Sequence, residues 1–486
     1  MCCGLRFEDF TRNVVRNYFS QNVPVCNNCL NYLFRLIHQR FSNAKMKKLK
    51  AKIKALLPRL KHTCRNLSVH GPTYLTRKDV HVVYRFIYFI IYVHVWIAAV
   101  AAIYKYVSAY REDTIRFTTR TDYLDWNTTF PSITICQIGN NEKILQQLQN
   151  TGPDNEEQLN FVKQIAFFRG DCPSCTWDNK TEYSTDLARL TSVYRSECKD
   201  LFITCTWDNK PVNCCQHFQP VQTEYGLCFS MNNIQFHEQF SYYVASSDRR
   251  HLGSLSVALS EDYEAFLHAR EDVPFWNMEQ DRRISVGYGM EATVSFSIVD
   301  IMNEPEVTFT VPNVRQCRFP SEVPSNFRGF SYYSYSVCIV ECRIHEQLNL
   351  CGCTSHLSPL EYKDKYCDLE GLQCLIRYND RLKRLRVPNV NETGLQCDCL
   401  PSCTEPDYNI ISKKLSLLGK PGGAISFILG NRPYERVTRQ LAHTTLDLVV
   451  AVGNCFGLGF GGSILSIVEF MYYICFNLNY ITQIKS

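Results

Sequence analysis

The sequence predicts a membrane protein with two transmembrane helices and a large, disulfide-rich α+β domain between them. Two apolar runs predict the helices, because residues 86–104 and 448–468 contain no formally charged side chain. Each run has about the length that a helix needs to cross the hydrocarbon core of a bilayer. The cysteines predict the domain, since 18 of the 25 lie from Cys136 to Cys403, a density typical of an oxidising compartment. The lipid bilayer is therefore an expected partner.

The charge distribution predicts the orientation. Nine Lys or Arg and no acidic residue lie from Lys45 to Arg65, and such a bias keeps the N-terminal region, 1–84, in the cytosol. This basic segment fits either an amphipathic helix on anionic lipid or a solvated linker. The first transmembrane helix, 85–107, lies too far along the chain for a cleaved signal peptide. Both termini are then cytoplasmic, and residues 108–446 face outside.

Several functional classes are not indicated. The net charge of +5 belongs mostly to the cytosolic part, so no nucleic-acid partner is expected. The sequence Cys26-Asn-Asn-Cys29 resembles half of a zinc site, but no second CxxC follows at the required spacing. The chain has no nucleophile elbow, no HExxH and no P-loop. We therefore expect no enzyme activity, no cofactor and no metal site.

The outer region reads as a mixture of strands and helices. Alternating apolar residues predict strands at 129–138 and 291–301, and helical periodicity predicts helices at 142–149 and 333–349. The polar, turn-rich segment 154–200 is interpreted as a surface excursion. Three glycosylation sequons fall outside, at Asn127, Asn179 and Asn391.

The cysteine spacing allows a disulfide ladder. Cys338 and Cys342 stand four apart, which in a helix puts them on one face about 6 Å apart. Cys397 and Cys399 stand two apart, about 6.6 Å in an extended strand. A helix beside a strand could therefore carry two rungs, although spacing alone does not give the connectivity.

The second apolar run has an unusual glycine pattern. Gly453, Gly457 and Gly461 recur every four residues, which favours either close packing between membrane helices or, together with Gly462 and Ser463, a break in the helix. Irregular backbone at membrane depth is tolerated only in protein or along a water-filled pathway, and rings of carbonyls can replace the hydration shell of an ion. One chain supplies only two helices, so a pore would require an oligomer.

Two acids flank this run. Asp447 lies at its outer edge and Glu469 at its cytosolic edge. Each either anchors the helix at the interface or concentrates cations at a pore mouth.

Four motifs carry a family resemblance. They are "SVHG" (68–71), "FPSITIC" (130–136), "CIVECRIHEQLNLCGC" (338–353) followed by "QCDCLPSC" (396–403), and "GLGFGGSILSIVE" (457–469). Together they resemble the degenerin/epithelial sodium channel family, and most closely its insect pickpocket branch.

The resemblance implies an amiloride-sensitive, sodium-permeable channel, assembled as a homo- or hetero-trimer in the plasma membrane. It implies an ectodomain of palm, β-ball, finger and thumb type, with the thumb at 317–403, a second transmembrane helix at 447–471 and a short tail at 472–486. The selectivity filter falls on Gly461, Gly462 and Ser463, and the family's acid falls on Glu469. Gating positions fall on His70, Gly71 and, to within one residue, Val450 or Ala451.

The resemblance also implies disulfide pairings. In the thumb these are Cys317–Cys403, Cys338–Cys399, Cys342–Cys397, Cys351–Cys374 and Cys353–Cys367; above it they are Cys136–Cys228 and Cys205 with Cys214 or Cys215. Cys172, Cys175, Cys198 and the remaining partner of the 214/215 pair are additional, and are expected to form two more bridges.

Two functional hypotheses follow. In the first, the chain is a stimulus-gated, pore-forming subunit, and extra glycine at 459 and 462 gives a looser filter than the family pattern. In the second, it is an accessory subunit that supports assembly, trafficking or ligand sensing in a heteromeric channel. No motif identifies the extracellular ligand or stimulus.

Overall fold

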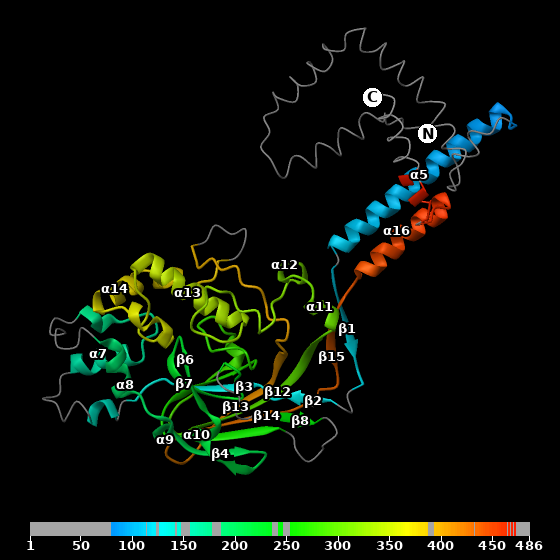
Figure 1. The fold of residues 1–486 in the computed structure, drawn as a ribbon. Coiled ribbons are helices and arrows are strands. Elements are labelled where there is room, and N and C mark those ends of the chain that lie inside the picture. Colours follow the sequence, from blue (N-terminus) through cyan, green and yellow to red (C-terminus); the bar gives the residue numbers. More distant parts are fainter. Residues whose placement is uncertain are drawn as a thin grey trace, which may run out of the picture. The chain divides into compact units, whose positions relative to one another are not determined.

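A computed structural model describes residues 79–472, apart from gaps at 113, 123–125, 141–142, 147–155, 177–185, 236–241, 246–252, 387–392, 432, 464, 467 and 470. The chain forms two units (Figure 1). One contains the two apolar helices, and the other comprises residues 113–443. Each unit is described by itself.

The first unit contains α5 (Val82–Glu112) and α16 (Thr445–Phe460), which lie side by side (Figure 1). Helix α5 is the one described helix that is long and apolar enough to cross a membrane. It extends beyond both ends of the expected span, 85–107. The apolar part of α16, Thr445–Gly459, is shorter than the 447–471 expected from the sequence.

The second unit is built on two larger antiparallel or mixed sheets. Within the described residues, the first has eight strands in the order β1-β15-β12-β14-β9-β4-β5, with β13 paired to β12. Their bounds are β1 Ile115–Arg120, β15 Arg436–Leu441, β12 Met290–Asn303, β14 Gly423–Leu429, β9 Ser254–Leu259, β4 Phe202–Trp207, β5 Lys210–Val212 and β13 Asp407–Leu417. The chain enters from α5 through β1 and returns to α16 through β15, and these two strands pair with each other.

The second sheet has five described strands in the order β11-β10-β3-β7-β6. These are β11 Arg283–Val286, β10 Tyr263–His268, β3 Ser132–Gln137, β7 Gly226–Met231 and β6 Gln219–Thr223. A small two-stranded sheet pairs β2 (Asn127–Thr129) with β8 (Tyr243–Ala245).

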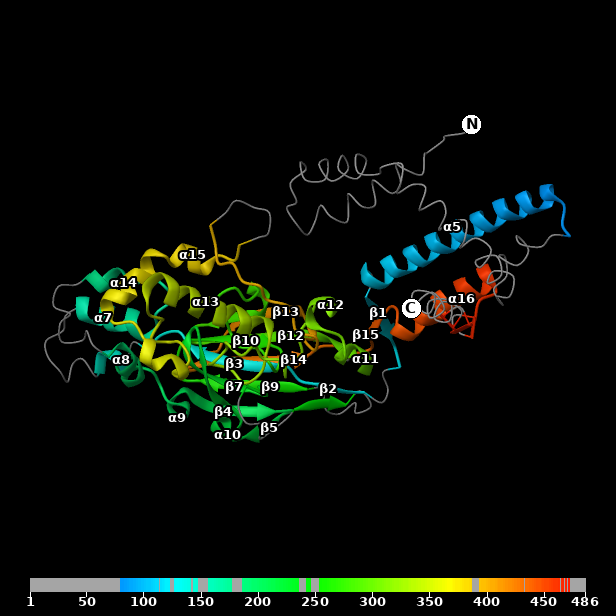
Figure 2. The same ribbon diagram turned by 45° about the horizontal axis from the view of Figure 1, so that its top comes forward.

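The pattern of burial explains the layering. Strands β9, β12 and β14 alternate buried and half-buried residues, as a sheet with one covered face does. Strands β3 and β10 are buried at every residue, because one of their faces packs on the larger sheet and the other on helix α13. The order of layers is therefore large sheet, five-stranded sheet, helix. Figure 2 shows α13, α14 and α15 gathered on one side of the strands.

The helical layer belongs mostly to residues 317–403, which we call the cysteine-rich region. Its long helix α13 (Tyr335–Cys351) begins where the Ser334 side chain caps Val337 N–H and ends at Gly352, whose φ is 72°, a conformation that glycine adopts without strain. Two short helices, α11 Pro305–Thr308 and α12 Pro312–Arg315, precede the cysteine-rich region. The other described elements within it are η5 Leu360–Lys365, α14 Leu369–Arg377 and α15 Asn379–Lys383.

The segment 154–200 differs from the expected surface excursion. It contains α7 (Glu156–Ala166), η2 (Pro173–Thr176) and α8 (Leu187–Tyr194). Phe161, Ile165 and their neighbours on α7 are fully buried, in one apolar cluster with residues of α14. The segment is therefore part of a second core. Three short elements, α9 Cys198–Leu201, α10 Cys214–His217 and η4 Gln280–Arg282, complete the unit.

Nine disulfides join the 18 cysteines from Cys136 to Cys403. Six are pairings that the resemblance implies without alternatives: 136–228, 317–403, 338–399, 342–397, 351–374 and 353–367. Cys205 pairs with Cys214, so that Cys215 is left for Cys198, and Cys172 pairs with Cys175. The ladder between α13 and the extended segment 396–399 therefore has the two rungs that the spacing allows.

Candidate functional site: the end of helix α16 and its link to the ectodomain

Helix α16 begins with a reciprocal cap. Thr444 accepts a hydrogen bond from Asp447 N–H through its hydroxyl, at 3.2 Å, and the Asp447 carboxylate accepts one from Thr444 N–H at 2.8 Å. This capping box satisfies two amide groups that a helix start leaves without partners. Asp447 thus has a structural role at the position where we expected an acid of the outer mouth.

One side of α16 packs against α5. The half-buried positions repeat at helical spacing and are Leu448, Ala451, Val452, Cys455 and Gly459. A side chain at Gly459 would meet Val95 and Ala99 of α5 at 3.5 and 3.7 Å, and Ala99 is the one described residue of α5 that is buried. These are ordinary van der Waals distances, so the packing of α16 on α5 has room for a small side chain at 459.

The other side of α16 is uncovered. Val450 is 50% exposed and Leu458 is 92% exposed. A side chain built on Gly453 or Gly457 would meet no atom within 4 Å. The two candidate gating positions therefore lie on different sides of α16, with Ala451 toward the packed side and Val450 on the uncovered side.

Helix α16 stops at the predicted filter. Its last helical residue is Phe460, and Gly461 adopts φ 57° and ψ 23°, a left-handed conformation. The Gly461 N–H donates to the carbonyl of Gly457 at 2.9 Å, and Gly462 N–H reaches back to Phe456 at 3.4 Å. These two bonds form the C-cap that glycine favours.

A second cap follows immediately. Ser463 N–H donates to the Ser466 hydroxyl at 3.2 Å, and Ser466 N–H donates to the Ser463 hydroxyl at 3.3 Å. Ser463 is thus the N-cap of the helical residues described after it. The Gly-Gly-Ser step leaves helical geometry, as one of the two interpretations of the sequence has it. The Ser463 hydroxyl, however, is engaged by Ser466.

The break leaves carbonyl groups available. Among the described residues, no backbone N–H donates to the carbonyl oxygens of Leu458, Gly459 and Phe460, because a helix end leaves its last carbonyls without partners. The helix dipole adds roughly half a negative charge at this end. Together these groups make the end of α16 attractive to a cation.

Glu469 lies six residues after Ser463 and is half-buried, within the partly described helical stretch that follows the break. The sequence expectation that it is an acid of the inner mouth stays a prediction.

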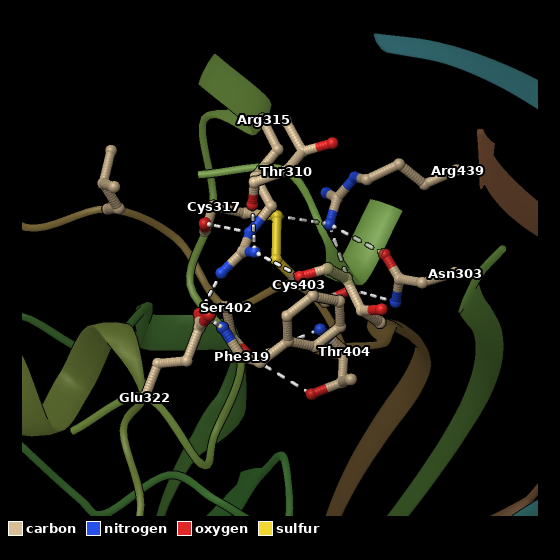
Figure 3. The surroundings of a disulfide bond; sticks show 12 residues. Asn303, Thr310, Arg315, Cys317, Phe319, Glu322, Ser402, Cys403, Thr404 and Arg439 are labelled. Atoms are coloured by element: carbon tan, nitrogen blue, oxygen red, sulfur yellow. Dashed lines mark hydrogen bonds and ion pairs between the residues drawn. A yellow bond between two sulfur atoms is a disulfide. The ribbon is translucent and has the colours of Figure 1, made fainter. Parts of the chain in front are cut away.

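In the ectodomain, the disulfide Cys317–Cys403 closes the cysteine-rich region at its two ends. Hydrogen bonds from Arg439 and Asn303 connect this arginine-lined disulfide to strands β15 and β12. Arg439 on β15 is buried and places Nη1 3.1 Å from the Cys403 carbonyl oxygen and 2.8 Å from Cys317 Sγ. Asn303 at the end of β12 donates to the same Cys403 carbonyl at 2.9 Å. Figure 3 shows the guanidinium groups of Arg315 and Arg439 turned toward this disulfide.

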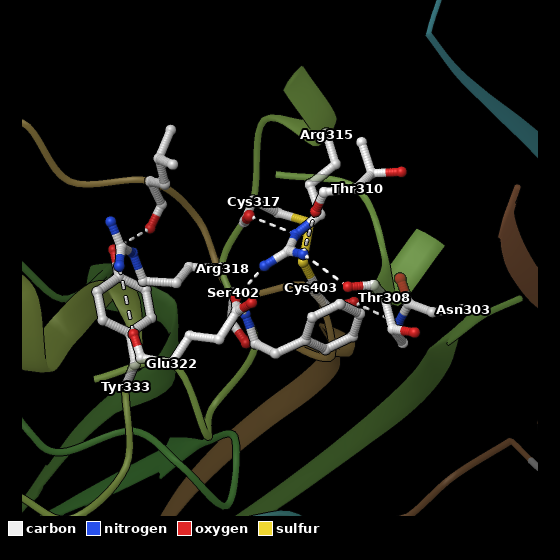
Figure 4. Close-up of polar contacts among 12 residues, drawn as sticks. Asn303, Thr308, Thr310, Arg315, Cys317, Arg318, Glu322, Tyr333, Ser402 and Cys403 are labelled. Carbon is white, nitrogen blue, oxygen red and sulfur yellow. Dashed lines mark hydrogen bonds and ion pairs between the residues drawn. A yellow bond between two sulfur atoms is a disulfide. The ribbon is translucent and has the colours of Figure 1, made fainter. Parts of the chain in front are cut away.

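Arg315 is the second arginine beside the disulfide Cys317–Cys403, and it holds the segment that contains Cys317. Arg315 is fully buried, donates to the carbonyls of Cys317 at 3.0 Å and Thr310 at 2.6 Å, and forms an ion pair with Glu322 (Figure 4). Burial lowers the pKa of Arg439, and the nearby positive charge of Arg315 lowers it further. Because buried charge is costly unless it is hydrogen-bonded, these contacts hold the base of the cysteine-rich region firmly on β15. That strand precedes α16 in the chain.

A cluster of carboxyl groups lies where α13 begins. Asp272 accepts from the Ser336 hydroxyl at 2.7 Å, and Glu271 accepts from the Thr404 hydroxyl at 2.7 Å. Burial raises the pKa of both carboxyls. Glu405 lies beside them, and burial, followed by the charges of Asp272 and Glu271, raises its pKa to about 9.

This cluster predicts a pH-dependent stability. Because the pKa of Glu405 is higher in the folded chain than in the unfolded chain, the folded state holds an extra proton between about pH 4 and about pH 9. The protonated Glu405 carboxyl therefore stabilises the fold fully at a pH below the pKa that Glu405 has in the unfolded chain. This stabilisation is lost as the pH rises toward 9. We expect the free energy of unfolding of the wild type to fall by about 1–3 kcal/mol more than that of Glu405→Gln between pH 6 and pH 8. Thermal unfolding of the full chain in detergent measures this difference.

The choice of a control variant for Glu405→Gln depends on the charged groups near Glu405. They are Asp272, Glu271 and Glu279, which raise its pKa, and Arg282, which lowers it. The exposed Glu361→Gln changes the same charge away from this cluster and should retain the pH dependence of the wild type. Parallel pH profiles of the wild type and Glu405→Gln would contradict the assignment.

Several predicted residues lie outside the described ranges, namely His70, Gly71, Asn179 and Asn391. Asn127 is exposed at the start of β2, and its carbonyl accepts from Arg436 at 2.9 Å. Its side chain is therefore reachable for glycosylation.

Sequence reasoning missed Arg315, Arg439 and Glu405. Single charged residues among many carry no periodic signal, so nothing in the sequence pointed to their burial. Ser466 was also missed, because the capping-box pattern has Glu or Gln three residues after the N-cap and this chain has serine there.

Comparison with known proteins places these features in context. The family described as "Amiloride-sensitive sodium channel" matches residues 63–473, which include α5, the ectodomain, the helix break and Glu469.

Individual relatives are distant in sequence, and the share of each chain that is covered varies from about half to nine-tenths. Sodium channel protein Nach of Drosophila ananassae is 24% identical over 480 residues, which is 90% of this chain and 91% of the relative. Pickpocket protein 11 of Drosophila melanogaster is 25% identical over 56% of this chain and 53% of its own length. Acid-sensing ion channel 1B of Danio rerio is 21% identical over 72% of this chain and 64% of its own length.

Proposed function

The chain belongs to the amiloride-sensitive sodium channel family, and from this premise we propose that it is a pore-forming subunit of a stimulus-gated sodium or cation channel. Members of this family are ion channels and not enzymes, and they act in the plasma membrane. The relatives of this chain include insect proteins named as sodium channel and pickpocket proteins. We propose two membrane crossings, with both termini in the cytoplasm and residues 108–446 outside.

The observation that carries the proposal is the helix break between Phe460 and Ser463. Gly461 ends α16 in a left-handed conformation, and three carbonyl oxygens before it receive no backbone hydrogen bond from described residues. In the membrane, such groups must face protein or a water-filled path. We propose that the carbonyls around Gly461, Gly462 and Ser463 line the narrowest part of a cation pathway.

The pathway requires more than one chain. Helices α5 and α16 pack on each other along one side of α16, which leaves Val450, Gly453 and Gly457 uncovered. Two helices do not enclose a pore, so we propose that the uncovered sides of α16 from three subunits, identical or different, face one another. Asp447 and Glu469 would then form rings of negative charge on either side of the break and concentrate sodium ions there.

The alternative is an accessory subunit. The observation that favours it is the engagement of the Ser463 hydroxyl by Ser466, because the hydrogen bond from Ser466 N–H occupies one lone pair of that hydroxyl and competes with coordination of an ion. In that case the chain would support assembly, trafficking or ligand sensing by a conducting partner.

The sodium current of cells that express this chain alone distinguishes the pore-forming role from the accessory role. We expect an inward sodium current that amiloride blocks, in cells where surface labelling shows the chain at the plasma membrane. Surface delivery without current in the absence of a partner, together with a larger current when a conducting family subunit is added, would overturn the pore-forming role. It would support the accessory role instead.

A further inference from the structure

A cavity of about 380 Å³ lies along one face of α13 in the cysteine-rich region. The residues that α13 contributes are spaced four, three, one and three apart, as on one side of a helix: Cys338, Cys342, His345, Glu346 and Asn349. The opposite wall is the extended segment 396–399. The cavity belongs to neither the helix break nor the arginine-lined disulfide.

The cavity is held open by covalent bonds. Cys338–Cys399 and Cys342–Cys397 fasten its two walls to each other at two levels. A site whose walls are fixed before a ligand arrives loses less conformational entropy on binding. Its volume also lies in the range of small-molecule sites.

The side-chain amides of Asn326, Asn349 and Gln396 offer this cavity both donors and acceptors. Three further polar groups, those of His345, Glu346 and Asp398, offer acceptors. His345 donates through Nδ1 to the Glu341 carbonyl at 2.8 Å, so that Nε2 of the neutral ring is left as an acceptor. Glu346 accepts from the exposed Arg381 at 2.5 Å, which leaves further lone pairs on its carboxylate. The exposed Asp398 carboxylate receives no hydrogen bond or ion pair from the described residues.

The one arginine of the cavity is already engaged. The Arg318 guanidinium lies 5.2 Å from the centre of the Tyr333 ring, and its Nη1 donates to the Glu322 carbonyl at 3.3 Å (Figure 4). Tyr333 in turn stacks with Phe327, with ring centres 6.3 Å apart and planes 20° apart. The cavity therefore combines acceptors and carboxylates with an aromatic wall.

This combination selects among ligand classes. The described residues contain no group of three or more His, Cys, Asp or Glu side chains that could hold a metal ion, so the acceptors are too dispersed for a bare cation. Two carboxylates disfavour an anion. An organic molecule with one positive charge and one aromatic ring matches both the acceptors and the stacked rings.

We propose that this cavity binds an arylalkyl amine, with its ammonium group toward Asp398 and Glu346 and its ring against Phe327. The ammonium supplies the donors that the carboxylates and His345 Nε2 accept, and the ring adds to the Phe327–Tyr333 stack. The proposal goes beyond channel function, because binding at this site does not depend on whether the chain conducts.

The probe is phenethylamine, measured by equilibrium dialysis against the full chain in detergent. We expect saturable binding with a Kd of about 1 mM or tighter. The neutral analogue 2-phenylethanol has the same ring and chain length, and it should bind roughly tenfold more weakly because it leaves the carboxylates without a positive partner.

Two variants locate the site. Asp398→Asn keeps the shape of an exposed side chain and should weaken phenethylamine binding by roughly tenfold. Asp364→Asn removes the same charge from an exposed position of η5 that does not line the cavity, and it should bind as the wild type does. Absence of saturable binding, equal binding of the alcohol, or equal losses in the two variants would each overturn the proposal.

Discussion

A Gly461→Val variant is expected to reach the cell surface and to carry roughly tenfold less sodium current per channel than the wild type, or none. The left-handed conformation of Gly461, with φ 57°, costs an ordinary residue about 1–2 kcal/mol, and a β-branched side chain is still less compatible with it. Valine therefore favours continuation of α16 through the break. The carbonyls that we propose for the cation pathway would then accept hydrogen bonds within the continued helix.

The control for this variant is Gly352→Val. Gly352 ends α13 with φ 72°, in the same left-handed role, and a side chain there would meet no atom within 4 Å. It carries the same backbone strain in the other unit of the chain. Patch-clamp current divided by biotinylated surface protein should fall for Gly461→Val and not for Gly352→Val. Equal changes in the two variants would mean that strain alone, and not the break, controls the current.

Replacing Cys317 and Cys403 by serine is expected to abolish surface delivery. Their disulfide has a sequence separation of 86 residues, but Cys338–Cys399 already crosslinks the chain inside it, so the loop that it alone closes consists of 317–338 and 399–403. Loss of such a crosslink lowers the free energy of unfolding by about 3–4 kcal/mol in the chain-entropy account. That is a large share of the roughly 5–15 kcal/mol that stabilises a folded domain. The change also disturbs the contacts of Arg439 with Cys317 and Cys403.

The disulfide between Cys172 and Cys175 provides the control for the Cys317/Cys403 variant. Their disulfide has a sequence separation of only 3 residues, so the same double serine substitution should cost about 1–2 kcal/mol. We expect this variant to reach the surface in reduced amount. Surface labelling compares the two, and normal delivery of the Cys317/Cys403 variant would contradict the structural role of that link.

The parts of the fold that follow from local spacing were predictable. Four-residue spacing of Cys338 and Cys342 and two-residue spacing of Cys397 and Cys399 match one helix beside one extended segment, and the disulfide ladder has this form. Strand β12 shows its alternation in the sequence as in the structure. A helix break after Phe460 was one of the two interpretations that the sequence allowed. In the structure, Gly461 forms a C-cap there and Ser463 forms an N-cap.

Features that depend on distant packing were not predictable. Helix α7 has an apolar face at helical spacing, formed by Phe161, Val162, Ile165 and Ala166. The partner of this face is not readable from the sequence, because it is α14, about 200 residues later in the chain. The same holds for Arg439, whose partners Asn303 and Cys403 come from separate segments. A charged residue reveals its burial only when the segments around it are assembled.

The sodium current per surface channel of the chain expressed alone, recorded for the wild type and Gly461→Val side by side, decides whether the break after Phe460 belongs to the cation pathway. We expect an amiloride-blockable current in the wild type and its loss in the variant. Equal currents in both would place ion selection away from the break after Phe460. No current from either at normal surface amounts, together with a larger current when a conducting family subunit is added, would contradict the pore-forming role itself.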